Sequence, residues 1–207
     1  MFRVLAIPLA ALAAGGSIQP LPAPLKAQLT GPAWHAGCPV PLAQLRVLTI
    51  THWGFDGRVH IGQLVVNHKA AAPLARVFRR LYELHFPIRH MRLADSYGPS
   101  RPADGDVSAA FECRQAVPSP CSGGTSTGRW SQHAYGEAVD LNPNENPYVG
   151  CGRTRNKARL PYLDRTRLRP GMVTPAVVRA FRSIGWSWGG AWAGNTKDYM
   201  HFSANGH

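Results

Sequence analysis

Residues 130–143 read Trp130-Ser131-Gln132-His133-Ala134-Tyr135-Gly136-Glu137-Ala138-Val139-Asp140-Leu141-Asn142-Pro143. A bend at Gly136 leads into a short apolar run. If residues 137–141 form a strand, Val139 and Leu141 face one side and Asp140 faces the other, where an apolar side chain would be expected. A carboxylate in such a place needs a cation or a hydrogen-bond network. The stretch therefore predicts a turn and a strand that bring His133 and Asp140 to one point.

A second histidine and a second acid follow some 60 residues further along, in the segment Lys197-Asp198-Tyr199-Met200-His201-Phe202-Ser203. Two histidines, one ligand aspartate and a spare acid are the groups of a hydrolytic zinc site that keeps one position open. We therefore expect His133, Asp140 and His201 to bind Zn²⁺. The alternative is a structural hydrogen-bonded pair of His133 and Asp140, because a chain with nine histidines contains such pairings by chance.

The ligand pattern resembles that of a known family. It consists of Ser131-x-His133-x-x-Gly136-x-Ala138-x-Asp140 followed by Asp198-x-x-His201-Phe202. This order and spacing are similar to those of the VanY-like D-alanyl-D-alanine carboxypeptidase family of zinc peptidases, whose relatives include the L-alanyl-D-glutamate endopeptidases of phage lysins. Further similar text includes Cys38-Pro39, Phe111-Glu112-Cys113-Arg114, Asn146-Pro147-Tyr148 and Gly185-Trp186-x-Trp188-Gly189-Gly190-x-Trp192, so the likeness runs from about Cys38 to Phe202.

The resemblance implies roles for individual residues. It makes the two histidines and Asp140 the zinc ligands, and Asp198 the general base. Many relatives have Glu at the base position and the lysin endopeptidases have Asp, so the cleaved bond stays open. An upstream arginine stabilises the oxyanion in the family, and Arg114 is the best positional match, with Arg92 and Arg101 as reserves. A structural or surface role for Arg114 remains an equal alternative in this arginine-rich chain.

Substrate contacts are expected on both sides of the ligands. Ser131 and Gln132 directly precede His133 and would support the ligand or touch substrate. Trp188 and Trp192 would line a cleft, although tryptophans in a Gly-rich segment are as often part of the core and its rim.

The first residues have the layout of a secretory signal peptide, with Arg3 followed by an apolar run that ends in small residues. We expect a signal peptide at residues 1–16, a Pro/Ala-rich linker or tail at 17–37, and a zinc peptidase domain at 38–207. No later run approaches the ~18 apolar residues of a membrane span. The sequence thus predicts a protein secreted to the cell wall.

Four cysteines in an exported chain predict two disulfides, with three alternative connectivities. Cys38 and Cys113 both lie in family-like text. The resemblance therefore favours pairing these two, which leaves Cys121 with Cys151.

The formal net charge is +12, and seven basic residues against one acid lie between Arg153 and Arg169. On an exported protein this segment indicates an anionic cell-wall polymer as partner; a merely solvated loop is the alternative. Nucleic acid is excluded by the signal peptide and by the absence of a suitable motif.

The pattern of apolar residues predicts an α+β fold. We expect strands at 44–53 and 58–67 around a Gly-containing turn, an amphipathic helix at 71–85 with Pro73 in its first turn, and a strand at 88–95. An irregular section at 96–130 precedes the ligands. A helix then starts after Thr174 and ends at Gly185, and a last strand covers 199–203 with Asp198 in the loop before it.

Helices packed on one side of a small antiparallel sheet would complete the domain. The resemblance implies a hedgehog/carboxypeptidase-like fold with zinc on the strands and adjoining loops. The function expected is hydrolysis of peptidoglycan stem peptides, as a carboxypeptidase or an endopeptidase. The alternative is a binding module for the wall or for polyanions that keeps the fold without turnover.

Overall fold

A computed structural model describes residues 16–99, 101–121 and 127–207. Its largest sheet is antiparallel, in the order β1 (Ser17–Pro20), β2 (Leu45–Trp53), β3 (Val59–Asn67). The predicted hairpin at 44–67 is confirmed: β2 and β3 pair along their whole length, from Leu45 opposite Asn67 to Trp53 opposite Val59. Gly57 supplies the positive φ (70°) that the turn needs. The signal peptide predicted at 1–16 lies, apart from residue 16, outside the described residues.

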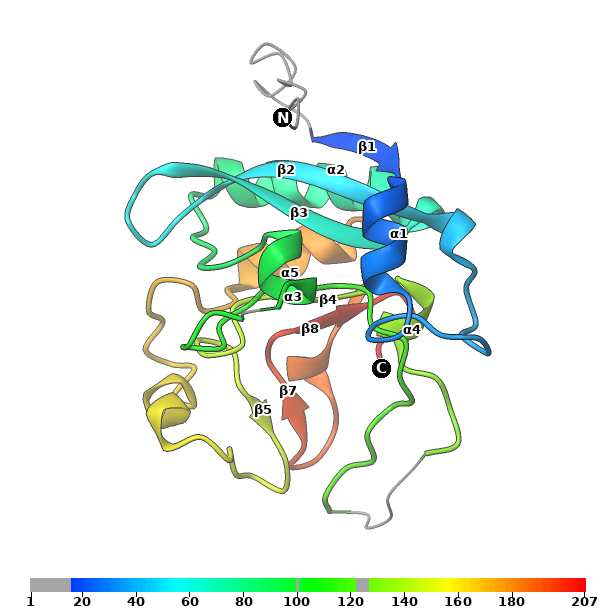
Figure 1. Ribbon diagram of the computed structural model, residues 1–207. Helices are drawn as coiled ribbons and strands as arrows, with labels where there is room; N and C mark the ends of the chain where they lie inside the picture. The colour runs from blue at the N-terminus through cyan, green and yellow to red at the C-terminus, as the bar shows by residue number, and fades with distance from the viewer. Residues whose placement is uncertain (1–15, 100, 122–126) are drawn as a thin grey trace.

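Helix α2 (His68–Glu83) covers one face of this sheet (Figure 1). It starts earlier than the periodicity suggested, because the Asn67 side chain accepts a hydrogen bond from the Lys69 N–H and caps the helix. Pro73 therefore lies inside the helix and not in its first turn. The main core contains residues of α2, of helix α5 (Pro175–Arg182), of β2 and β3, and also Val139 and Phe202. At its centre the rings of Phe181 and Phe202 stack with centroids 3.8 Å apart.

Residues 17–37 are not an irregular linker. They form β1 and helix α1 (Ala23–Leu29), and Leu21, Leu25 and Leu29 are buried in a second core. This core also takes Val47 and Val65, which point away from α2. The prolines led to the prediction of an irregular segment. Pro22, however, precedes the helix, and Pro24 lies in its first turn, where a missing N–H costs nothing.

Two smaller antiparallel sheets complete the chain and replace the single sheet expected. One has the order β4 (Ala138–Asp140), β8 (His201–Ser203), β6 (Ser187–Trp188), and the other pairs β5 (Tyr148–Val149) with β7 (Lys197–Asp198). Helices also cover both faces of the β1–β2–β3 sheet, and not one face, because α1 lies opposite α2 (Figure 1). The mixed composition of helices and antiparallel strands agrees with the α+β prediction.

The strand predicted at 88–95 is wrong. Pro87 and His90 make only isolated bridges, to Trp53 and Val107, and helix α3 (Leu93–Tyr97) begins within the same stretch. Burial explains the error, since Ile88 and Met91 both point into the main core at a spacing of three.

The last helix follows the prediction at its start. Thr174 accepts a hydrogen bond from the Val177 N–H, and Pro175 is the first helical residue. Its cap at the other end is Ser183, two residues before Gly185, which has φ of 83°. Short helices α4 (Gln132–Tyr135), η2 (Leu42–Gln44), η3 (Lys157–Tyr162) and η4 (Gly189–Ala191) fill the connections. Among the described residues, no helix is long and apolar enough to cross a membrane.

Two disulfides hold the irregular section. Cys38 is bonded to Cys113, and Cys121 to Cys151, which confirms the pairing that the resemblance favoured. The first bond joins the loop after α1 to Cys113, in the segment that precedes His133. The second joins Cys121 to Cys151, two residues after the end of β5.

The N-terminal segment should contribute to the stability of the fold. Leu29→Ala removes a fully buried side chain and should lower the free energy of unfolding by about 2–5 kcal/mol. Urea denaturation followed by circular dichroism measures it, with Lys26→Ala on the exposed side of the same helix as control. Equal stability of the two variants would restore the linker interpretation.

Candidate metal centre

Backbone pairing between β4 and β8 brings two of the expected ligands together. Asp140 lies directly opposite His201, and Val139 lies opposite Phe202. Side chains alternate along each strand, so Asp140 and His201 share one face while Val139 and Phe202 enter the main core on the other. The His201 Nδ1 lies 3.1 Å from Asp140 Oδ1.

His133 reaches the same point from helix α4. Ser131 caps this helix by accepting a hydrogen bond from the His133 N–H, and Gly136 ends it with a left-handed φ of 66°. The His133 Nδ1 contacts the carbonyl oxygen of Ala110. With Nδ1 protonated and donating there, Nε2 presents its lone pair to the cluster, which is the usual arrangement of a metal-binding histidine.

The separations of the ligand atoms fit a tetrahedral ion. The Nε2 of His133 lies 3.2 Å from the Nδ1 of His201 and 3.3 Å from the Oδ2 of Asp140. Two bonds of about 2.0–2.1 Å at a tetrahedral angle place their ligand atoms roughly 3.3 Å apart. Two neutral imidazole nitrogens and a carboxylate are also the donors that zinc prefers. These residues therefore fit a zinc ion, although hydrogen bonds alone also hold the cluster together.

Electrostatics favour the ionised carboxylate at the centre. Burial acts to raise the pKa of Asp140, but His133 and His201 outweigh it and hold that pKa well below its usual range. Burial acts to lower the pKa of His133, and Asp140 outweighs it, so this pKa lies above its usual value. The carboxylate is thus available as an anionic ligand at neutral pH.

Asp198 lies beside the cluster without belonging to it. The residue is part of the two-residue strand β7, opposite Tyr148, and not in a loop as expected. Tyr199 and Met200 separate β7 from β8, so Asp198 and His201 do not share one strand, on which an offset of three would point their side chains to opposite faces. Gly189 packs against it, since an added Cβ would lie 2.6 Å from the Asp198 carbonyl oxygen.

The carboxyl of Asp198 is in the state expected for a proton-transfer group. Its Oδ1 is buried and accepts no hydrogen bond from the residues that the structure describes. Burial raises the pKa of Asp198 to about 7, and the nearby Asp140 carboxylate acts in the same direction. Such a group can accept and release a proton near neutral pH.

A cavity of about 600 Å³ opens onto the cluster. His133 and Asp140 lie in its wall, together with Ala110 and Phe111. Other wall residues come from α1, from α3 and from the loop after α3, and include Gln28, Tyr97 and Arg101. Of these, only Arg101 had an expected role, as a reserve for the oxyanion donor. The ligand cluster is therefore reachable from solvent through a cavity large enough for a peptide segment.

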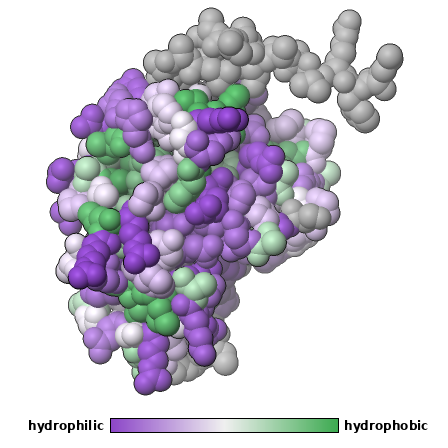
Figure 2. All heavy atoms as spheres, turned by 90° about the vertical axis from the view of Figure 1, so that its left-hand side faces the viewer, coloured by the Kyte–Doolittle hydropathy of each residue, from purple (hydrophilic) through white to green (hydrophobic). Residues whose placement is uncertain are grey.

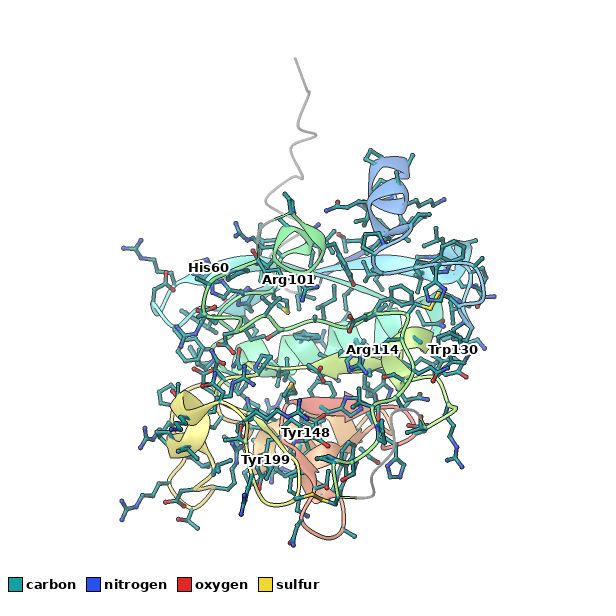
Figure 3. All side chains as sticks on the ribbon, turned by 60° about the horizontal axis from the view of Figure 1, so that its bottom comes forward. His60, Arg101, Arg114, Trp130, Tyr148 and Tyr199 are labelled. Carbon is teal, nitrogen blue, oxygen red and sulfur yellow. A yellow bond between two sulfur atoms is a disulfide. The ribbon has the colours of Figure 1, made fainter. Side chains whose placement is uncertain are left out.

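Arg114 directly follows the disulfide-bonded Cys113, in the segment that precedes His133. Its carbonyl accepts a hydrogen bond from the Ser131 N–H, and its side chain forms an ion pair with Glu112 at 2.9 Å. Figure 3 shows Arg114 near Trp130, which forms a bridge with the neighbouring residue Gln115. The charge of Arg114 is close enough to act on the pKa values of both His133 and Asp198. Of the two reserves, Arg92 pairs with Asp95, whereas Arg101 lines the cavity.

The expected substrate contacts divide into two kinds. Ser131 is buried and caps the N-terminus of α4, so it positions His133. The backbone carbonyl of Gln132 accepts hydrogen bonds from the Gly136 and Glu137 N–H groups at the C-terminal end of the helix. Trp188 donates to the Tyr199 carbonyl and packs against the main core. Only Trp192 has its ring beside a ligand, with its centroid 6.0 Å from that of His201.

Two buried asparagines, to which the sequence analysis assigned no role, hold the loop after Asp140. Asn142, with φ of 42°, donates to the carbonyls of Pro87 and Gly171. Asn146 donates to the Leu141 carbonyl and accepts from the Val173 N–H. These hydrogen bonds fix the strand end that carries Asp140. Asn146 belongs to the segment Asn146-Pro147-Tyr148, which is similar to the family. This similarity was the signal in the sequence that could have identified the residue.

Comparison with known families supports the resemblance. Residues 124–204 match the family model described as D-alanyl-D-alanine carboxypeptidase. This range contains His133, Asp140, His201 and Asp198, whereas Arg114 precedes it. No curated protein and no solved structure matches the chain. The hedgehog/carboxypeptidase-like fold therefore stays a prediction.

The raised pKa of Asp198 should be visible in the stability of metal-free protein. The folded pKa of about 7 lies above the unfolded value of about 3.9, so the contribution of this group to stability falls as pH rises between the two. Asp198→Asn should therefore raise the Tm more at pH 8 than at pH 5, with a gain at pH 8 of roughly 3 °C or more. Calorimetry with a chelator present measures it.

Asp164→Asn is the matched control for this experiment, because Asp164 is exposed and its pKa is lowered by its hydrogen bonds to Thr166. It should show no such gain. If Asp198→Asn changed the Tm equally at both pH values, Asp198 would not be a buried group of raised pKa.

Proposed function

We propose that this chain, similar over residues 124–204 to D-alanyl-D-alanine carboxypeptidases, is a zinc-dependent peptidase that hydrolyses stem peptides of bacterial peptidoglycan. The observation that carries the proposal is the cluster of His133, Asp140 and His201 next to the buried carboxyl of Asp198, whose Oδ1 accepts no hydrogen bond from the described residues. Metal ligands alone would suit a structural site. A spare buried acid and an open cavity beside them suit hydrolysis.

In this proposal His133 Nε2, Asp140 and His201 Nδ1 hold the zinc ion. When bound, zinc in a three-ligand site lowers the pKa of a water molecule to about 7 and polarises the substrate carbonyl. Asp198 accepts the proton of the attacking water and passes it to the leaving amine. Its pKa near neutrality supports both steps.

Arg114 is the proposed donor to the oxyanion. Its charge acts on the pKa values of His133 and Asp198, which supports this role, and contact with substrate would require its release from the ion pair with Glu112. Ser131 and Gln132 position His133, and Trp192 supplies an apolar surface beside His201. Arg101 is available in the cavity wall for a carboxylate of the substrate.

We also propose that the protein acts outside the cytoplasm. The two disulfides support this location. Within the segment Arg153–Arg169, Arg159 and Arg165 bond inward, to Asn144 and Asn146, and the other five basic residues lie at the surface. Figure 2 shows a largely hydrophilic face with small hydrophobic areas. The exposed basic side chains of this segment suit contact with an anionic wall polymer.

Two substitutions separate metal binding from proton transfer. Asp198→Asn should keep one zinc ion per chain but lower the turnover of wall peptides by about 10²–10⁴-fold, because it removes the base. His133→Ala should lose both zinc and activity, because it removes a ligand. Zinc content is measured by elemental analysis, and activity by mass spectrometry of purified wall fragments.

The masses of the products also identify the bond. Release of D-alanine indicates a carboxypeptidase, and cleavage within the stem indicates an endopeptidase. Circular dichroism must show both variants folded. If wild-type protein binds zinc and cell wall but releases no peptide, the enzyme hypothesis is wrong and the protein is a non-catalytic binding module.

A further inference from the structure

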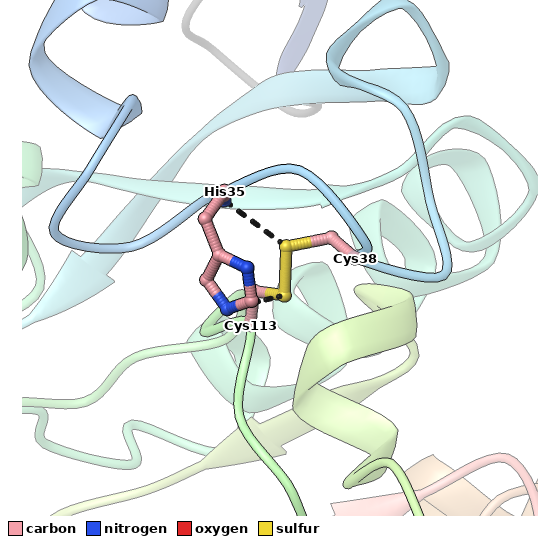
Figure 4. Close-up of side chains that lie close together, drawn as sticks. All are labelled: His35, Cys38 and Cys113. Atoms are coloured by element: carbon pink, nitrogen blue, oxygen red, sulfur yellow. Dashed lines mark hydrogen bonds between the residues drawn. A yellow bond between two sulfur atoms is a disulfide. The ribbon is translucent and has the colours of Figure 1, made fainter.

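A second group of metal-binding side chains lies outside the site described above. His35, in the loop after α1, lies against the disulfide between Cys38 and Cys113 (Figure 4). Its backbone N–H donates to the Cys38 Sγ at 3.2 Å, and its Nε2 lies 3.6 Å from the Cys113 Sγ. One imidazole and two sulfurs are thus gathered at a single point.

The imidazole is oriented as a ligand would be. The Nδ1 of His35 lies 2.9 Å from the carbonyl oxygen of Ala36. With that nitrogen protonated and donating, the lone pair of Nε2 points toward the Cys113 sulfur. His133 shows the same arrangement, with its Nδ1 on the Ala110 carbonyl and its Nε2 toward the cluster. A backbone carbonyl on the second ring nitrogen fixes the tautomer of metal-binding histidines.

Backbone hydrogen bonds hold the three residues together independently of the disulfide. The Cys113 N–H donates to the Ala33 carbonyl at 2.9 Å, and the Cys38 N–H donates to the His35 carbonyl at 3.1 Å. His35 is exposed and Cys38 partly buried, so a reductant and an ion can both reach them. Breaking the sulfur–sulfur bond therefore leaves the ligands near one another.

We propose that reduction of the Cys38–Cys113 disulfide converts this group into a second zinc site, made of His35, Cys38 and Cys113. A dithiol reductant gives two electrons and two protons to the disulfide and leaves as its own disulfide. The two thiols then release their protons as the thiolates bind Zn²⁺. The imidazole is the third ligand and water occupies the fourth position.

The geometry of zinc is compatible with these residues. Two zinc–sulfur bonds of about 2.3 Å at a tetrahedral angle place the sulfurs about 3.8 Å apart. The Cα atoms of Cys38 and Cys113 are 5.9 Å apart, so rotation of the side chains can supply this separation without moving the backbone. Thiolates with an imidazole favour zinc over magnesium or calcium.

The second disulfide provides an internal comparison. Cys121 lies 3.5 Å from the Thr196 hydroxyl, and among the described residues no histidine or acid joins Cys121 and Cys151 in a group able to hold a metal. Reduction of that bond should therefore create no zinc site. Replacing both of its cysteines with serine leaves a chain in which only the proposed site responds to reductant.

The test measures zinc bound by the full-length chain carrying Cys121→Ser and Cys151→Ser, before and after treatment with a phosphine. The phosphine takes the oxygen of a water molecule as it reduces the disulfide to two thiols. We expect one additional equivalent of zinc after reduction, and with cobalt a sulfur-to-metal charge-transfer band that the oxidised protein lacks. His133→Ala should leave this increment unchanged, which separates it from the proposed peptidase site.

His35→Ala should weaken the additional equivalent at least about tenfold, whereas His68→Ala, at another exposed histidine, should not change it. Zinc should also raise the Tm of the reduced protein, and this rise should be lost in His35→Ala. The proposal is overturned if reduction adds no zinc, or if His35→Ala binds it as tightly as the parent. A reduced chain that stays unfolded with zinc present overturns it equally.

Discussion

The antiparallel pairing of β4 with β8 is the constraint on which the site depends. The pairing sets Asp140 opposite His201 and Val139 opposite Phe202. A shift by one residue would move the apolar pair out of the core and the polar pair into it. Burial of Phe202 beneath Phe181 therefore fixes the register, and the register fixes the distance between two ligand atoms. Stability of the core and geometry of the site are specified by the same contact.

The position of His133, the third expected ligand, depends on contacts between α4 and the large sheet. Gly136 ends α4 with its carbonyl bonded to the Asn67 N–H, and a Cβ there would lie 2.6 Å from that nitrogen. The side chain of Asn67 also donates to the Tyr135 carbonyl and caps α2. One asparagine thus joins the end of the hairpin, the start of the main helix and the turn that carries His133. The position of His133 therefore depends both on the local turn at Gly136 and on hydrogen bonds to the distant residue Asn67.

Much of this arrangement could be predicted from local signals. The hairpin follows from alternation around Gly57, and α5 from its Thr174 cap. Placement of His133, Asp140 and His201 in one cluster follows from their spacing and the family resemblance. Asp198 was expected near them, but the break at Tyr199 and Met200 that places it there depends on pairing with β5, which no local pattern reveals.

Other features depend on contacts between distant residues. The carbonyl of Ala110 carries no side-chain signal, although it orients His133. The sequence of residues 88–95 resembled an alternating strand, but Ile88 and Met91, three residues apart, both enter the core from an irregular segment. Helix α1 was hidden by its prolines, and its packing against Val47 and Val65 is a property of the folded chain only.

That packing also affects the cavity beside the cluster. Gln28 and Pro32 form part of the cavity wall, and Leu25 and Leu29 cover the outer face of the large sheet. A chain that lacked residues 17–37 would expose Val47 and Val65 and open one side of the cavity. The N-terminal segment therefore contributes to the shape of the cavity as well as to the burial of the large sheet.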